Sequence, residues 1–275
     1  MLPALLRRLV REVVPPSVVL WRQALYARKY GERELDLISC LCDPNRTSVD
    51  IGANEGLYCN RMRALSRKTH AFEAVKSLAD ELRWKFGQSV TVHHLAVSSR
   101  SGRGSLKIPV VGGMGLTGLS TLSPTALDAS AEIEVEDVDL CRLDDVPLGD
   151  VGFIKIDVEG HEGAVLEGAT ATIERCRPNI LVEAEERHSP GTTAAVGAFF
   201  AARRYSGVFV RHEELRPFHE FDLATMQNPR DFPEIGSVSH RGSHNYVNNF
   251  IFLPNERAET TCGQIKRLLK VDAAA

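Results

Sequence analysis

The amino-acid sequence predicts an α/β fold whose central sheet is mainly parallel. From Ser48 onward, short β-rich runs alternate with longer helical segments, which is the pattern of successive βαβ units. A turn that contains two glycines follows the first of these runs. Such a turn is typical of doubly wound sheets, which bind ligands at the carboxyl ends of their strands. Together these observations favour a Rossmann-like, doubly wound domain.

The predicted strands of the parallel part cover residues 48–51, 70–72, 90–94, 153–156 and 179–182. Two later runs, 207–210 and 249–253, are also strand-like, and the polar segment 212–246 separates them. We expect these two runs to form an antiparallel hairpin at one edge of the sheet. The glycine-rich stretch 99–135, followed by a strand candidate over 132–138, is expected to be a small insertion.

Both ends of the chain lie outside this alternating pattern. Leucines and valines at helical spacing, with arginines between them, predict an amphipathic helix that ends before Pro15 and Pro16. Residues 17–42 also have a helical pattern, whose apolar contacts would be Trp21, Leu25, Leu35, Leu37 and Ile38. We therefore divide the chain into an N-terminal helical segment (1–44), a cofactor-binding domain (45–255) and a C-terminal tail (256–275).

A basic amphipathic N-terminal helix has two roles open to it. It can make peripheral contact with a membrane surface, or it can pack on its own domain or on a second subunit of a homo-oligomer. The sequence alone leaves both roles open.

Composition restricts the partners and the compartment. The formal charge of −3 and a pI near 6.3 give no overall positive field to hold a nucleic acid. The six cysteines lack the paired spacing of a zinc site, and free thiols are typical of a reducing cytoplasm. No run approaches the roughly 18 apolar residues of a membrane span. We expect a cytoplasmic protein that binds neither nucleic acid nor a structural metal.

The turn after the first predicted strand combines glycines with polar side chains. Gly52 and Gly56 allow a tight turn and a close approach of ligand to backbone. Their spacing differs from the G-x-G-x-x-G pattern that seats a dinucleotide pyrophosphate. Asp50 and Asn54 instead offer a carboxylate and an amide to an amino-acid-like group, which suits the methionine end of S-adenosylmethionine.

Two further residues fit the rest of such a cofactor. Glu73 ends the second predicted strand, where a carboxylate can accept hydrogen bonds from both hydroxyls of a ribose. Ala96 or Val97, at the end of the third predicted strand, would lie beside the adenine. The ribose contact is common to nicotinamide and S-adenosylmethionine sites, so it does not by itself separate the two.

These motifs resemble those of the FkbM-family methyltransferases. The resemblance rests on V-D-I-G-A-N-E-G (49–56), A-F-E (71–73), L-A-V-S (95–98), L-D-D-V (143–146), F-I-K-I-D-V-E-G-H-E (153–162) and I-L-V-E (180–183). It implies a methyltransferase fold, S-adenosylmethionine as cofactor and O-methylation. The acceptor it implies is a small molecule or glycan, commonly a sugar, a lipid-linked glycan or a polyketide.

Methyl transfer to an alcohol needs a positioned base that takes the hydroxyl proton. Asp157 is the first candidate, because it directly follows a predicted buried strand at the sheet edge where acceptors bind. His161 is the second candidate and His188, in the loop after the next strand, is the third. Alternatively, Asp157 with Glu183 or Glu185 could hold a Mg²⁺ that lowers the pKa of the acceptor. The sequence does not decide between these options.

Two other functions compete with this reading. Residues 113–118 match G-x-G-x-x-G literally and would indicate an NAD(P)-dependent oxidoreductase, but the residues that follow them make a poor helix. We therefore regard the match as chance within a glycine-rich loop. The other competitor is a non-catalytic binding module of the same fold, and the joint presence of five residues argues against it: Asp50, Gly52, Gly56, Glu73 and Asp157.

Overall fold

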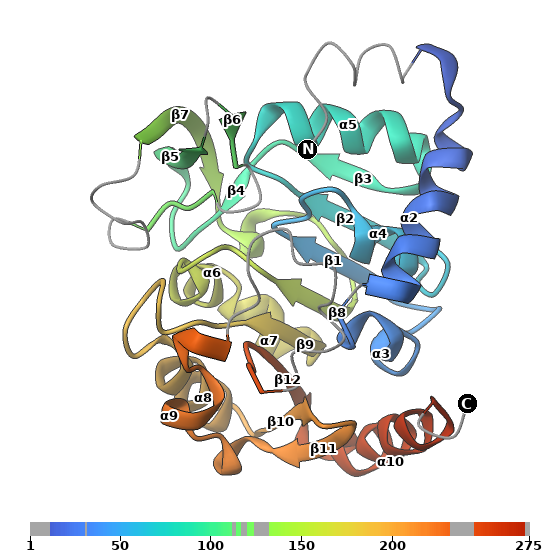
Figure 1. Ribbon diagram of the computed structural model, residues 1–275, viewed down its shortest axis with the longest axis vertical. Coiled ribbons are helices and arrows are strands. Elements are labelled where there is room, and N and C mark those ends of the chain that lie inside the picture. Colours follow the sequence, from blue (N-terminus) through green and yellow to red (C-terminus); the bar gives the residue numbers. More distant parts are fainter. Residues whose placement is uncertain are drawn as a thin grey trace.

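A twisted sheet of eight strands forms the centre of the molecule in the computed structural model (Figure 1). The structure describes residues 12–30, 32–111, 114–116, 120–123, 132–231 and 245–272. Strand order in the large sheet is β11-β10-β12-β9-β8-β1-β2-β3, and a second sheet has the order β4-β7-β5-β6. The α/β class and the mainly parallel sheet predicted from the sequence are confirmed.

Five neighbouring strands of the large sheet are parallel. They are β1 (Thr47–Ile51), β2 (Lys68–Phe72), β3 (Thr91–His93), β8 (Val151–Ile156) and β9 (Asn179–Glu183). Every residue of β1 and β8 is buried, as expected for strands covered by helices on both faces. All five predicted parallel strands are therefore present, within a few residues of their expected bounds.

The antiparallel part of the sheet differs from expectation in one respect. Strand β12 (Asn249–Pro254) pairs antiparallel with β10 (Tyr205–Arg211), as predicted. However, β12 also pairs with β9 and therefore lies inside the sheet. The edge is formed by β11 (Glu214–Pro217), which the sequence analysis did not predict. The turn before β11 places His212 and Glu213 at positive φ. Neither residue is typical of hairpin turns, which favour Asn, Asp and Gly.

Helices cover both faces of the large sheet. One layer holds α6 (Glu162–Gly168), α7 (Thr170–Cys176) and α8 (Thr192–Ala201), and the other holds α3 (Glu34–Leu41), α4 (Leu57–Met62) and α10 (Asn255–Asp272). The strands supply alternate residues to the two layers, as period-two geometry requires. Ile154 of β8 belongs to the first core cluster and Phe153 to the second.

Two more helices complete the side of the sheet near β2 and β3. Helix α5 (Lys76–Phe86) follows β2, and α2 (Pro16–Tyr30) packs against both α4 and α5. Helix α2 runs along the right-hand side of Figure 1. The short helix α9 (Leu223–Met226) follows β11 in the chain. No helix within the described ranges has the length and apolar character of a membrane span.

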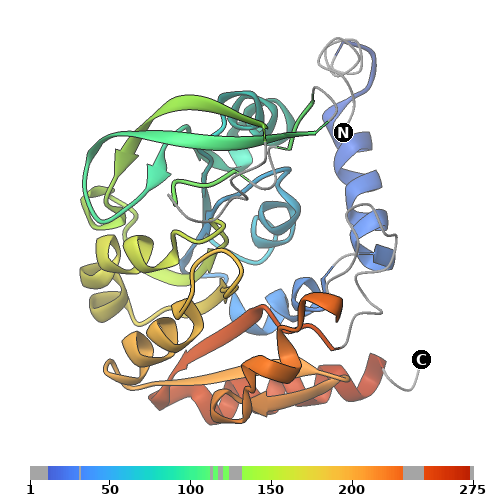
Figure 2. The ribbon, with the colours of Figure 1, turned by 60° about the vertical axis from the view of Figure 1, so that its left-hand side comes forward.

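The insertion predicted over residues 99–135 is largely a β-ribbon. Strands β5 (Gly102–Val111) and β7 (Glu132–Cys141) pair antiparallel along their length and lie at the top of Figure 2. β4 (Ala96–Val97) and β6 (Met114–Gly115) complete the small sheet. The strand candidate over 132–138 is thus confirmed as part of β7, whereas β5 was not predicted from the sequence. Gly102 and Gly104 lie at the start of β5, and glycine weakens the strand signal.

The segments outside the alternating core contain both buried and exposed apolar residues. Most of the predicted C-terminal tail (256–275) belongs to helix α10 (Asn255–Asp272), whose Ile265 and Leu269 are buried in one core cluster with residues of the sheet. In the N-terminal segment, Trp21 and Leu25 are exposed instead of packed. The helix predicted before Pro15 falls mostly on residues 1–11, which lie outside the described ranges.

Because Ile265 is fully buried, we expect Ile265→Ala to lower the free energy of unfolding by about 2–5 kcal/mol. The exposed neighbour Gln264 provides the control, and Gln264→Ala should change it by less than about 0.5 kcal/mol. Urea denaturation followed by circular dichroism measures both values. Equal, small effects would mean that α10 is dispensable to the fold.

Candidate functional site

A cavity lies at the carboxyl ends of β1, β2 and β8. It encloses about 600 Å³ of open space, including the part that opens to solvent. Six of the nine residues selected from the sequence line it: Gly52, Asn54, Glu73, Ala96, Asp157 and His161. Apolar side chains of Phe72, Leu95 and Val97 contribute to the same walls. The structure therefore brings together residues that are more than 100 positions apart in the chain.

Gly52 joins the ends of two strands. Its φ of +76° lies in the left-handed region, and a Cβ atom there would sit 1.7 Å from the backbone oxygen of Asp157. The amide of Asp157 in turn donates to the carbonyl of Ile51 at 3.0 Å. Only glycine permits this approach, and the approach places the Asp157 side chain beside the turn.

Glu73 connects this turn to the end of β2. One carboxylate oxygen accepts from the amide of Asn54 at 2.7 Å and the other from the amide of Val75 at 2.8 Å. Burial raises the pKa of Glu73 to about 7. Each oxygen keeps a second lone pair, so the carboxylate can still accept hydrogen bonds from two ligand hydroxyls.

Two residues selected for the cofactor do not line the cavity. Asp50 is 1% exposed, and its Oδ2 accepts from the Cys59 thiol at 3.1 Å. Its Oδ1 has no hydrogen-bond partner in the described part of the chain, and burial raises its pKa. Gly56, with φ of +83°, packs against Leu82 and Phe86, where a Cβ would come within 2.7 Å of either side chain. Gly56 therefore shapes the turn and its packing on α5.

Asp157 is paired with a buried cation that the sequence analysis missed. Nζ of Lys155 lies 2.6 Å from Oδ2 of Asp157 and 4.8 Å from the centre of the Tyr58 ring. Burial alone would lower the pKa of Lys155, but Asp157 and Asp50 outweigh it and raise that pKa. A lysine within an otherwise apolar buried strand was the available signal, since a buried ammonium needs a carboxylate nearby.

His161 is the histidine that reaches the cavity. It occupies the N-cap position of α6, and its Nε2 lies 3.0 Å from the hydroxyl of Ser98. Burial lowers the pKa of His161, so the imidazole is neutral near pH 7. A neutral imidazole in this position can accept a proton.

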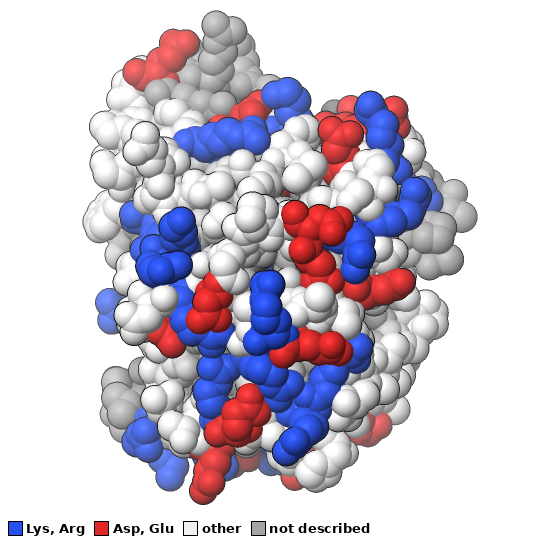
Figure 3. All heavy atoms as spheres, turned by 180° about the vertical axis from the view of Figure 1, so that it is seen from behind, with Lys and Arg blue, Asp and Glu red and all other residues white. Residues whose placement is uncertain are grey.

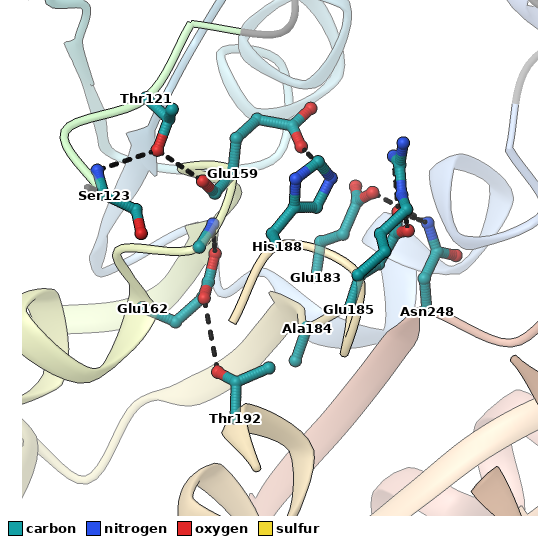
Figure 4. Close-up of polar contacts among 12 residues, drawn as sticks. Thr121, Ser123, Glu159, Glu162, Glu183, Ala184, Glu185, His188, Thr192 and Asn248 are labelled. Atoms are coloured by element: carbon teal, nitrogen blue, oxygen red, sulfur yellow. Dashed lines mark hydrogen bonds and ion pairs between the residues drawn. The ribbon is translucent and has the colours of Figure 1, made fainter. Parts of the chain in front are cut away.

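His188 lies behind the cavity wall and contacts Glu159. Its Nε2 is 2.7 Å from Oε2 of Glu159, an ion-pair distance (Figure 4). Burial lowers the pKa of His188, but Glu159 outweighs this effect and raises it. Between them, Gly160 adopts φ of +94°, and a Cβ there would come within 3.0 Å of His188. His188 itself does not line the cavity, but its partner Glu159 does.

A second polar network follows β9. Asn248 donates to Glu183 at 2.7 Å and to Glu185 at 3.1 Å, and Tyr246 donates to Glu185 at 2.8 Å. Burial raises the pKa of Glu183. Burial would also raise the pKa of Glu185, but the ion pair with Arg187 outweighs it and holds that pKa near 2. In the described residues no group of three or more His, Cys, Asp or Glu side chains has the arrangement of a metal site.

The small sheet and the neighbouring segment 120–123 contribute residues to the cavity lining. The hydroxyl of Thr121 donates to the backbone oxygen of Glu159 at 2.5 Å and accepts from the amide of Ser123 at 2.9 Å (Figure 4). Thr121 also exchanges backbone hydrogen bonds with Lys107 of β5. Ser120 and Leu122, on either side of it, line the cavity. No residue of the segment 120–123 was selected as a site residue from the sequence.

The G-x-G-x-x-G match does not form a dinucleotide turn in its described part. Met114 and Gly115 form strand β6, which pairs with the end of β5. Gly113, Thr117 and Gly118 lie outside the described residues. A pyrophosphate-binding motif would instead open a helix at this point.

Comparison with known proteins gives a match to one family model. Residues 50–220 match the model of the methyltransferase FkbM domain. No curated protein matches the chain.

Among solved structures, methyltransferase FkbM from Methylobacillus flagellatus KT shares 15% sequence identity with a TM-score of 0.48. The match covers 76% of this chain but only 44% of that protein. SMU.1697c, a putative methyltransferase from Streptococcus mutans in complex with SAH, shares 9% identity with a TM-score of 0.42, and the match covers 80% of this chain and 94% of that one.

The contact between Gly52 and the Asp157 carbonyl predicts a large effect of a single methyl group. We expect Gly52→Ala to lower the free energy of unfolding by about 4 kcal/mol or more, because the clash is with backbone and cannot be relieved by a rotamer change. Gly149 is the matched control: its φ is +75°, and a Cβ there meets nothing within 4 Å. Gly149→Ala should cost only the conformational penalty of about 1–2 kcal/mol. Similar losses in urea denaturation of the two variants would contradict the assignment.

Proposed function

Because the chain belongs to the FkbM methyltransferase family, we propose that it is an S-adenosylmethionine-dependent O-methyltransferase. The acceptor we propose is a hydroxyl group of a sugar, a glycan-lipid or a polyketide-like molecule. The observation that carries the proposal is the cavity that unites the glycine turn and Glu73 with Asp157 and His161. The residues proposed to bind the cofactor and the residues proposed to accept the proton therefore line the same cavity.

The residues present fit the proposed cofactor. Glu73 offers two carboxylate oxygens to the ribose hydroxyls, and the apolar wall at Phe72, Leu95 and Val97 suits an adenine ring. Asp50 keeps a buried oxygen without a partner, which a positively charged group nearby would stabilise. A nicotinamide dinucleotide would need a pyrophosphate seat, and the described part of 113–118 does not supply one.

S-adenosylmethionine, when bound, supplies a methyl group on a positively charged sulfur. The protein must then hold an acceptor hydroxyl in line with that methyl group and remove its proton. We assign the role of proton acceptor to a carboxylate oxygen of Asp157. This residue lines the cavity and is held in place by Lys155. His161 is the second candidate, because its neutral imidazole reaches the same space.

Glu159 and His188 have a positioning role in this proposal. Glu159 lines the cavity and contacts His188. Its backbone oxygen accepts a hydrogen bond from the hydroxyl of Thr121, in the segment 120–123. Their contact fixes the loop that follows Asp157, and the two groups together carry little net charge when His188 is protonated. Neither group needs to exchange a proton with the acceptor.

The cofactor assignment is tested at Glu73. Glu73→Ala should weaken the affinity for S-adenosylmethionine about 10-fold to 150-fold, because two hydroxyls lose a charge-assisted acceptor. Wild-type affinity should also fall as the pH drops below about 7, since protonation of Glu73 removes an acceptor lone pair. Isothermal titration calorimetry measures both effects, with the exposed Glu167→Ala as the control. Tighter binding of NAD than of S-adenosylmethionine would reverse the proposal.

The chemical step is tested at Asp157. Asp157→Asn should keep cofactor binding but reduce turnover on the order of 10²–10⁴-fold, because the negative charge that takes the proton is lost. Turnover is measured with labelled S-adenosylmethionine and cell extracts as the source of acceptors, by the mass of the product.

Two controls separate the alternatives at this step. Wild-type turnover in Asp157→Asn would transfer the role to His161, whose signature is a rate that falls as the pH drops through the lowered pKa of its imidazole. A chelator that abolishes activity, with recovery on adding Mg²⁺, would instead indicate a metal-assisted reaction.

A further inference from the structure

Helix α2 presents apolar side chains to solvent. Val18, Trp21 and Leu25 are 42%, 62% and 49% exposed, and their spacing of three and four residues places them on one side of the helix. Soluble surfaces rarely group large apolar side chains in this way without a partner. Nothing in the described part of the chain covers this side.

Exposed basic residues lie on the same side. Arg22 and Arg28 are exposed, and residues 16–30 contain no Asp or Glu. Arg22 lies four residues after Val18, and Arg28 lies three after Leu25, so these cations flank the apolar side chains. Long basic side chains can lay their aliphatic stems on an apolar surface while the charged head groups stay in water.

The opposite side of α2 is fixed to the domain. Leu20 and Ala27 are buried, and the side-chain amide of Gln23 donates to the backbone oxygen of Glu55 at 3.0 Å. Glu55 belongs to the glycine turn that lines the cavity, and Lys85 donates to the same oxygen at 3.0 Å. The exposed side is thus one helix diameter, about 10–12 Å, from the candidate cofactor turn.

On the back face of the molecule, basic side chains are interspersed with acidic ones (Figure 3). Arg46, for example, pairs with Asp150 at 2.8 Å, and Arg177 pairs with Glu256 at 3.0 Å. These pairs neutralise each other and tie neighbouring segments of the fold together. Helix α2 differs because it supplies cations and exposed apolar side chains without any acid of its own.

We propose that this side of α2 docks the protein on the surface of an anionic membrane. Trp at the headgroup level, aliphatic side chains below it and flanking cations are the features of interfacial helices. The positive charge of this side makes a second copy of the chain a poor partner for it. Two such helices face to face would oppose Arg22 and Arg28 of one copy to the same arginines of the other, with no acidic residue on either helix to offset them, whereas anionic lipids supply negative charge.

Vesicle binding by the full chain tests this proposal. Vesicles of equal parts phosphatidylglycerol and phosphatidylcholine should sediment the protein, vesicles of phosphatidylcholine alone should not, and added salt should weaken the binding. The chain has two tryptophans, so a Trp84→Phe variant leaves Trp21 as the reporter. Its emission should shift to shorter wavelength on the anionic vesicles, because Trp21 then leaves water.

Matched variants locate the docking surface. Trp21→Ser with Leu25→Ser should reduce vesicle binding about tenfold or more, and Arg22→Gln with Arg28→Gln about 10-fold to 30-fold. The control removes exposed apolar side chains elsewhere, Val135→Ser with Leu223→Ser, and should bind as the wild type does. Thermal melting confirms that each variant is folded, and this readout is independent of any methyltransferase activity.

Three outcomes would overturn the proposal. The first is failure of the wild type to bind anionic vesicles, and the second is equal binding by the Trp21→Ser, Leu25→Ser variant. The third is self-association in analytical ultracentrifugation that this variant abolishes while no vesicle binding is seen, which would make a second copy the occupant.

Discussion

The close approach of Gly52 to the Asp157 carbonyl is the contact on which the rest of the site depends. Strands β1 and β8 are neighbours in the sheet, and their chains must turn away from it at the same place. A side chain at position 52 would force them apart, and the turn would no longer reach Glu73. With glycine there, backbone hydrogen bonds hold the ends of β1, β2 and β8 around one cavity. Rigid elements, rather than mobile loops, therefore set the distance between the two halves of the site.

Charge balance is the second condition for this arrangement. Asp50 and Glu73 are buried and Glu183 is half-buried at the carboxyl ends of three strands, and desolvation raises the pKa of each. Lys155 is the cation among them and is shared between Asp157 and Asp50. An excess of buried negative charge is costly unless a positive group neutralises it. The sulfonium of the proposed cofactor is such a group, so ligand binding and stability should be coupled in this protein.

The sequence predicted the parallel sheet and selected six of the residues that line the cavity, because both depend on local patterns. Apolar runs of strand length and the turn at Gly52 are visible without knowledge of distant contacts. Lys155 and Thr121 were missed because their roles come from partners far along the chain or on another sheet. Strand β11 was missed for a related reason, since its turn uses non-glycine residues at positive φ that neighbouring contacts must stabilise.

The position of β12 has a consequence for the order in which the protein can be assembled during synthesis. This strand lies between β9 and β10, although the ribosome makes it after both of them. Until residues 249–254 have emerged from the ribosome, β9 is an open sheet edge with unpaired backbone groups. The β10–β11 hairpin cannot join the sheet in that interval, because β12 is the strand that connects it to β9. The nascent chain thus carries an incomplete sheet for the time needed to translate more than sixty further residues, counted from Glu183 to Asn249. During that interval it is most exposed to pairing with another nascent chain, and chaperone capture would be most useful then.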